Sequence, residues 1–88
     1  MGKTLVIYKV YPEEMEQVNE VEKGLREKTF SKGELKDLKV EDIGFGVKLF
    51  KIAILFNDTK NGELEATEKE LKAVSNVKEI EVEGMNLL

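Results

Sequence analysis

The feature of this sequence that most constrains its fold is the order of two residue patterns along its 88 residues. Runs rich in β-branched and aromatic residues, with alternating faces, indicate strands at Thr4–Tyr11, Glu34–Ile43, Val47–Phe56 and Val77–Val82. Apolar residues three and four positions apart, the helical period, cover about residues 13–28 and 63–75, and turn-forming residues fill 57–62. The predicted order is therefore strand, helix, strand, strand, helix, strand.

This order predicts an α+β fold of the ferredoxin-like type, a βαββαβ sandwich in which two helices cover one face of a four-stranded antiparallel sheet. Right-handed crossovers place the first and third strands in the centre of the sheet. Both strands have apolar residues on two faces, and Tyr8 and Phe50 are expected on the face under the helices. No linker interrupts the pattern, so residues 1–88 are predicted to form one domain.

Several local features sharpen this prediction. Pro12 is expected to end the first strand and Gly84 to interrupt the last one, while Gly24 is expected to let the first helix pack closely against the sheet. Strict alternation in the second strand places Leu35 and Leu38 on opposite faces. The first helix is predicted to bury a stripe formed by Met15, Val18, Val21 and Leu25.

Composition excludes most chemistry. The chain has no cysteine and no histidine, which excludes disulfides, thiolate nucleophiles, imidazole bases and the usual zinc sites. Its carboxylates are scattered along the chain, and none has a neighbouring group that would shift its pKa value for general acid–base catalysis. We therefore predict that the chain is not an enzyme and that it uses no cofactor and no metal.

Charge and hydropathy also limit the partners. The net charge of −4 and a single arginine, Arg26, argue against direct binding of nucleic acid. The longest near-apolar stretch, Ile52–Phe56, is far shorter than the roughly 20 residues that cross a bilayer, and no signal peptide follows Lys3. The expected location is cytoplasmic, with no membrane partner.

The most informative motif is the run from Ile43 to Lys48, in which Phe45 stands between two glycines at a strand junction. Its residues leave two interpretations open. Phe45 either folds back into the core from a tight connection, or is an exposed aromatic anchor for a protein partner on a stiff loop. Lys48 is close enough to meet an acidic group on such a partner, whereas Lys9 and Lys51 are expected to be solvated side chains of the open sheet face.

The chain resembles the short, archaeal-type form of the elongation factor 1-beta family, a guanine-nucleotide exchange domain. The resemblance covers nearly all 88 residues, and its most specific part is the glycine-bracketed phenylalanine before the third strand. The stretches that match are Met1–Val10 with Pro12, Ile43–Lys48, and Val77–Leu88.

This resemblance implies a GTPase partner, elongation factor 1-alpha, which the chain binds in its GDP-bound and nucleotide-free forms. The chain itself is expected to be monomeric when free. The resemblance also implies that one end of the domain docks near the nucleotide site, with Phe45 in a pocket and the C-terminal tip close by. Eukaryotic members carry a lysine next to the last residue, where this chain has Leu87, so direct displacement of magnesium by an ammonium group is not implied. The usual proline before the motif is Asp42 here, which predicts a looser loop. The predicted partner-binding residues are Ile43, Gly44, Phe45, Gly46, Lys48, Asn86, Leu87 and Leu88.

Two other functions share this fold class. RNA-recognition domains carry a Gly-Phe-Gly-aromatic signature on the third strand, which Gly44–Gly46 with Phe50 partly imitates. The leading basic position of that signature is Ile43 here, and its second stacking position is Val47. A small-molecule-sensing domain is the other alternative, and no residue of the sequence decides for or against it.

Overall fold

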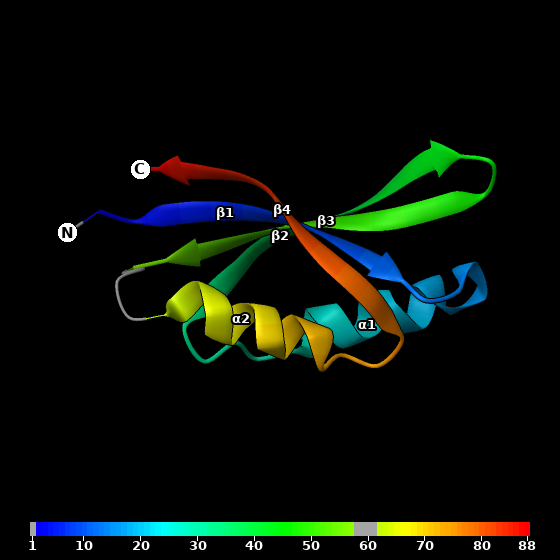
Figure 1. Cartoon of the computed structure of the whole chain (residues 1–88), viewed down its shortest axis with the longest axis horizontal. Helices are drawn as coiled ribbons and strands as arrows, with labels where there is room; N and C mark the ends of the chain where they lie inside the picture. The colour runs from blue at the N-terminus through cyan, green and yellow to red at the C-terminus, as the bar shows by residue number, and fades with distance from the viewer. Residues whose placement is uncertain (1, 58–61) are drawn as a thin grey trace.

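Two layers make up the structure, a computed structural model that describes residues 2–57 and 62–88 (Figure 1). One layer is a four-stranded sheet, and the other contains two helices on the same face of that sheet (Figure 1). The predicted ferredoxin-like fold is confirmed, and most of the loop expected over 57–62 lies outside the described residues. The elements in chain order are β1 (Thr4–Pro12), the 3-10 turn η1 (Met15–Gln17), α1 (Val18–Glu27), β2 (Gly33–Gly44), β3 (Val47–Phe56), α2 (Glu63–Lys72) and β4 (Val77–Leu87).

The strands lie in the order β2-β3-β1-β4, and every neighbouring pair is antiparallel. The prediction that the first and third strands are central is therefore confirmed. Their register runs from Thr4 opposite Phe56 to Val10 opposite Phe50. In the part of the chain that the structure describes, neither helix is long and apolar enough to cross a membrane.

The core lies between the sheet and the two helices. Tyr8 and Phe50 are fully buried there, as predicted, so neither ring is available on the open face. Burying each large apolar side chain contributes on the order of 1.5–3 kcal/mol, which makes this single layer the main source of stability. From the helices the core receives Val21, Leu25, Thr67 and Leu71.

Tyr8 brings a polar group into this core. Among the described residues none offers its hydroxyl a hydrogen bond, although the oxygen is buried. Burial, together with the Glu68 carboxylate, raises the pKa of Tyr8 to about 12.

Two of the four irregularities in strand pairing correct the predicted strands. Leu35 pairs with Ile54 and Asp37 with Ala53, so Lys36 is an extra residue that shifts the alternation. Leu35 and Leu38 consequently lie on the same, helix-covered face, and their predicted separation was wrong.

The second bulge lies in β4, where Ile7 pairs with Gly84 and Tyr8 with Val82, which makes Glu83 the extra residue. The strand continues past Gly84 to Leu87, contrary to the predicted interruption. The strand continues because only Glu83 is left out of the pairing, and β1 still pairs with the residues that follow the bulge.

The first strand ends at Pro12, as predicted, and Pro12 itself pairs with Val77 of β4. Two smaller predictions need correction. A Cβ atom on Gly24 would lie 3.0 Å from Cγ1 of Val74, so this glycine packs against the chain just after α2 and not against the sheet. Met15 belongs to η1, because α1 begins only at Val18, and it therefore lies outside the buried stripe.

Candidate partner-docking site

The turn between β2 and β3 has an unusual backbone. Gly44, Phe45 and Gly46 have φ angles of +96°, +57° and +75°, three consecutive residues in the left-handed region. Among the described atoms, none lies within 4 Å of a Cβ built on either glycine, so glycine is needed here for its conformation and not for space. Phe45 carries a side chain in the same region, which costs roughly 1–2 kcal/mol.

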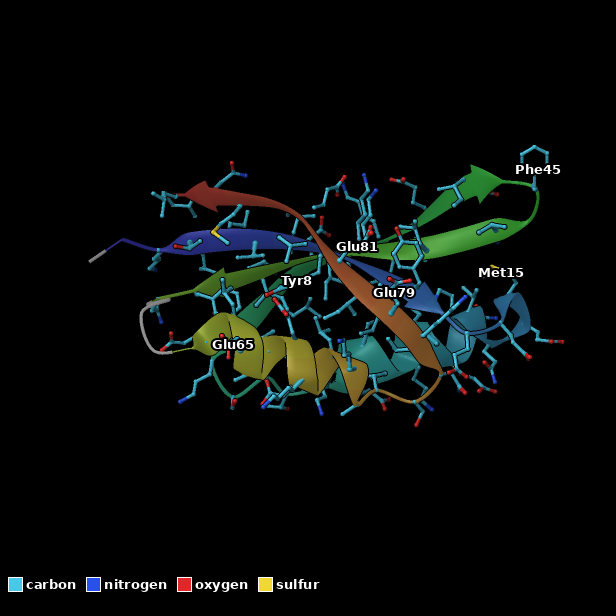
Figure 2. All side chains as sticks on the ribbon, in the orientation of Figure 1. Tyr8, Met15, Phe45, Glu65, Glu79 and Glu81 are labelled. Carbon is cyan, nitrogen blue, oxygen red and sulfur yellow. The ribbon has the colours of Figure 1, made fainter. Side chains whose placement is uncertain are left out.

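The ring of Phe45 extends from this turn into solvent (Figure 2). Its relative exposure is 106%, so the core interpretation of the motif was wrong and the ring is exposed, while its role as an anchor for a partner stays a prediction. A strained residue whose side chain covers nothing in its own chain typically marks a functional position.

Asp42 holds this turn in place. Its Oδ1 atom accepts a hydrogen bond of 2.9 Å from the N–H of Gly44, two residues later. Aspartate commonly stabilises turns in this way. A side-chain hydrogen bond thus stands at the position where proline would fix the φ angle, and the looser loop that we expected from the absence of proline stays a prediction.

Other exposed apolar side chains surround the turn. Ile43 is half exposed, Val40 and Val47 are slightly less so, and Met15 of η1 is 37% exposed. We call the exposed apolar residues of the hairpin itself, Val40, Ile43, Phe45 and Val47, the hairpin patch; Met15 lies beside it but belongs to η1. Sequence reasoning missed Val40 and Val47 as members, because it assigned them to the alternation of strands, and it assigned Met15 to a helix. The predicted site residue Lys48 is exposed beside the patch.

The C-terminal tip forms a second apolar surface. Leu87 pairs with Thr4 at the end of β1, and the N–H of Leu88 donates to the carbonyl oxygen of Lys3 at 2.8 Å. The side chains nevertheless remain exposed, at 82% for Leu87 and 70% for Leu88. We call Met85, Leu87 and Leu88 the C-terminal patch. The predicted Asn86 is exposed and pairs with Leu5.

The hairpin patch and the C-terminal patch lie at opposite ends of the molecule (Figures 1 and 2). β3 begins where β1 ends, and β4 ends where β1 begins, because both are antiparallel to β1. The longest dimension of the molecule is 42 Å. Phe45 and the C-terminal tip therefore do not lie at one end of the domain, and the part that each plays in docking stays a prediction. The predicted strand order already implied this separation.

Paired charges occupy the open face of the sheet. Lys51 Nζ lies 2.9 Å from Glu41 and 3.0 Å from Glu83, and these carboxylates raise its pKa. Lys51, expected to be a solvated lysine, is thus a bridge across the sheet. The hydroxyl of Tyr11 donates to Glu81 at 2.8 Å, which raises the pKa of Tyr11. Within residues 2–57 and 62–88, no group of three or more acidic side chains is arranged to hold a metal ion.

The scaffold is a small α+β domain of the ferredoxin-like type that carries an exposed aromatic turn. A solved structure supports the fold: the ACT domain from the GTP pyrophosphokinase of Chlorobium tepidum aligns with a TM-score of 0.58 and 15% sequence identity. The alignment covers 93% of this chain and 99% of that one. At this level of identity the likeness concerns the fold alone.

Sequence comparison identifies the family. Residues 5–88 match the family described as the EF-1 guanine nucleotide exchange domain. Proteins named elongation factor 1-beta are similar along the whole chain. That of Methanoregula boonei is 35% identical over 83 residues, 93% of each chain, and that of Desulfurococcus amylolyticus is 34% identical over 89 residues, covering 100% of this chain and 99% of the relative. That of Thermoplasma volcanium is 30% identical over the full length of both.

The chain belongs to the EF-1 guanine nucleotide exchange domain family. Membership and the names of the relatives support a nucleotide-exchange factor of translation elongation. The resemblance stated from the sequence is thereby confirmed.

Proposed function

We propose that this chain accelerates the release of GDP from elongation factor 1-alpha, in the cytoplasm, by binding the GTPase through the hairpin patch and the C-terminal patch. Family membership supports the class of activity. The observation that carries the proposal is Phe45, whose ring is fully exposed on a strained backbone held by glycines and by Asp42. Aromatic side chains in such positions dominate the binding energy of many protein interfaces.

No catalytic side chain is required for this activity. A factor that binds the nucleotide-free GTPase more tightly than the GDP-bound form must, by reciprocity, weaken GDP binding by the same factor. Each 1.4 kcal/mol of that difference lowers the affinity for GDP tenfold. The exchange factor therefore acts as a binding protein and forms or breaks no covalent bond.

The geometry shapes how the GTPase would be bound. Because the two patches lie at opposite ends of a molecule 42 Å long, a partner that uses both must reach along the whole domain. At the C-terminal patch, Leu87 and Leu88 offer only apolar side chains. This end would disturb the magnesium site by displacing GTPase elements next to it, and not by placing a cation there.

Release of a fluorescent GDP analogue from the cognate elongation factor 1-alpha tests the proposal. We expect micromolar concentrations of this protein to increase the release rate well above its spontaneous value, and an unrelated GTPase to remain unaffected. A release rate that does not change at those concentrations would refute the proposed function.

A second experiment addresses the alternative of RNA binding. A gel-shift with single-stranded RNA should show only weak binding, because Tyr8 and Phe50 lie under the helices and the chain is acidic. Tight, salt-sensitive binding combined with no effect on GDP release would favour the RNA-recognition function instead.

A further inference from the structure

Where the hairpin leaves the body of the sheet, it loses one of its two neighbouring strands. The pairing between β1 and β3 ends at Val10 opposite Phe50. Continued by two residues, the same register would place Lys48 opposite Pro12, which has no N–H. In the described structure, Pro12 pairs with β4 and the chain then turns into η1.

Beyond Phe50, β2 and β3 therefore continue as a two-stranded ribbon with Phe45 at its tip. A two-stranded hairpin is only marginally stable by itself in water. Something outside the ribbon must fix its direction if Phe45 is to be presented in one orientation.

Met15 makes that contact. The backbone N–H of Lys48 donates a hydrogen bond to Met15 Sδ, with a nitrogen–sulfur distance of 3.0 Å. The amide thus points to the side of β3 that β1 occupies further along the sheet, and the sulfur takes the place of a β1 carbonyl oxygen. Figure 2 shows Met15 at the same end of the molecule as Phe45.

The segment that carries Met15 is itself fixed to the body of the protein. The N–H of Glu13 donates to the carbonyl oxygen of Asn76 at 2.8 Å, which ties this segment to the turn between α2 and β4. The N–H of Gln17 donates to the carbonyl oxygen of Glu14 at 3.0 Å and closes η1. The position of Met15 is thus set by two backbone contacts that do not involve the hairpin.

We infer that Met15 is a positioning residue of the exchange factor: its sulfur completes the hydrogen bonding of β3 at Lys48 and thereby holds the ribbon that presents Phe45. This inference rests on the proposed function. Without the sulfur the ribbon can pivot near Phe50, and docking must then include the entropy of ordering it. One net hydrogen bond corresponds to about a 2- to 10-fold effect on binding.

Two variants separate positioning from simple contact with the partner. Met15→Leu keeps an apolar side chain of similar volume and removes the acceptor. Met15→Gln removes the apolar end of the side chain and supplies a carbonyl oxygen at a similar reach. If Met15 positions the hairpin, Met15→Leu slows GDP release about 2- to 10-fold and Met15→Gln stays near the wild-type rate. If Met15 only contacts the GTPase, the order of the two variants is reversed, and that result would overturn the inference.

Hydrogen exchange of the Lys48 amide, followed by NMR on the free protein, gives a readout that does not depend on the GTPase. We expect faster exchange of this amide in Met15→Leu, protection close to wild type in Met15→Gln, and melting temperatures within a few degrees for both. Unchanged protection of Lys48 in Met15→Leu would overturn the inference. Failure of the proposed function would appear separately, as a wild-type protein that does not accelerate GDP release.

Discussion

Replacing Phe45 by alanine should separate folding from docking almost completely. The ring is fully exposed, so its removal uncovers no apolar surface in the free protein. Alanine retains a Cβ atom at φ +57°, so the backbone strain is also retained. We therefore expect the free energy of unfolding to change by less than about 0.5 kcal/mol. If the ring is an anchor, the complex should lose about 2–4 kcal/mol, which reduces exchange at least about 30-fold.

Replacing Phe45 by glycine adds a second arm to this prediction. Removal of the Cβ atom relieves roughly 1–2 kcal/mol of left-handed strain, against about 0.5–1 kcal/mol of extra backbone entropy lost on folding. The glycine variant should thus be as stable as the natural protein, or more stable by up to about 1.5 kcal/mol. It should lose exchange activity as fully as the alanine variant does, so function and stability would change in opposite directions.

Thermal melting and GDP release measured on the same preparations test both variants. Val82→Ala is a matched control, because Val82 is a half-exposed apolar residue of β4 outside both patches, and we expect it to leave exchange unchanged. In a domain of this size 1 kcal/mol corresponds to about 4–8 °C in melting temperature. A drop of more than about 10 °C in Phe45→Ala would refute the reasoning, and so would normal exchange by that variant.

Three further predictions concern other parts of the chain. Deleting Leu87 and Leu88 removes two exposed side chains, so the melting temperature should fall by only a few degrees while GDP release slows; full activity would exclude the C-terminal patch from the mechanism. Tyr8→Phe removes a buried, unpaired hydroxyl and should leave stability unchanged or raise it by up to about 1 kcal/mol. It should also reduce the loss of stability between pH 10 and about 12, where the phenol ionises in the unfolded chain but not in the folded one, as urea midpoints across that range would show. Gly33→Ala would place a Cβ atom 2.5 Å from Cγ2 of Ile54, so its urea midpoint should correspond to a loss of about 1–3 kcal/mol, and an unchanged midpoint would mean that the strand end shifts freely.

The fold could be predicted from the sequence because its main signals are strong and local. The two central strands carry apolar residues on both faces, and the helices repeat theirs at the helical period, so burial and topology agree. The bulges at Lys36 and Glu83 could not be predicted in the same way. Each is an adjustment between two strands, and Lys36 and Glu83 are charged residues like several others of the same strands.

The candidate site was predicted only in part. Glycines on both sides of Phe45 indicated the sharp turn, and the structure shows the exposed ring that one of the two interpretations required. Met15 gave no such signal, because its spacing fits a helical stripe equally well and its contact with Lys48 spans 33 residues of sequence. The two patches lie far apart because of the directions in which the strands run. A single sequence motif carries no information about those directions.

The β4 edge has a consequence for how the molecules behave toward one another in solution. Its backbone has one free side, but Glu79, Glu81 and Glu83 follow one another along it. If two molecules joined their β4 strands in antiparallel fashion around Glu81, that residue would face its own copy, and Glu79 would lie near the bulge residue Glu83 of the second molecule. Like charges directly opposite each other destabilise such pairing. The monomeric state that we predict for the free protein then has an electrostatic origin, and acid or high salt should weaken the barrier that keeps these edges from assembling into larger sheets.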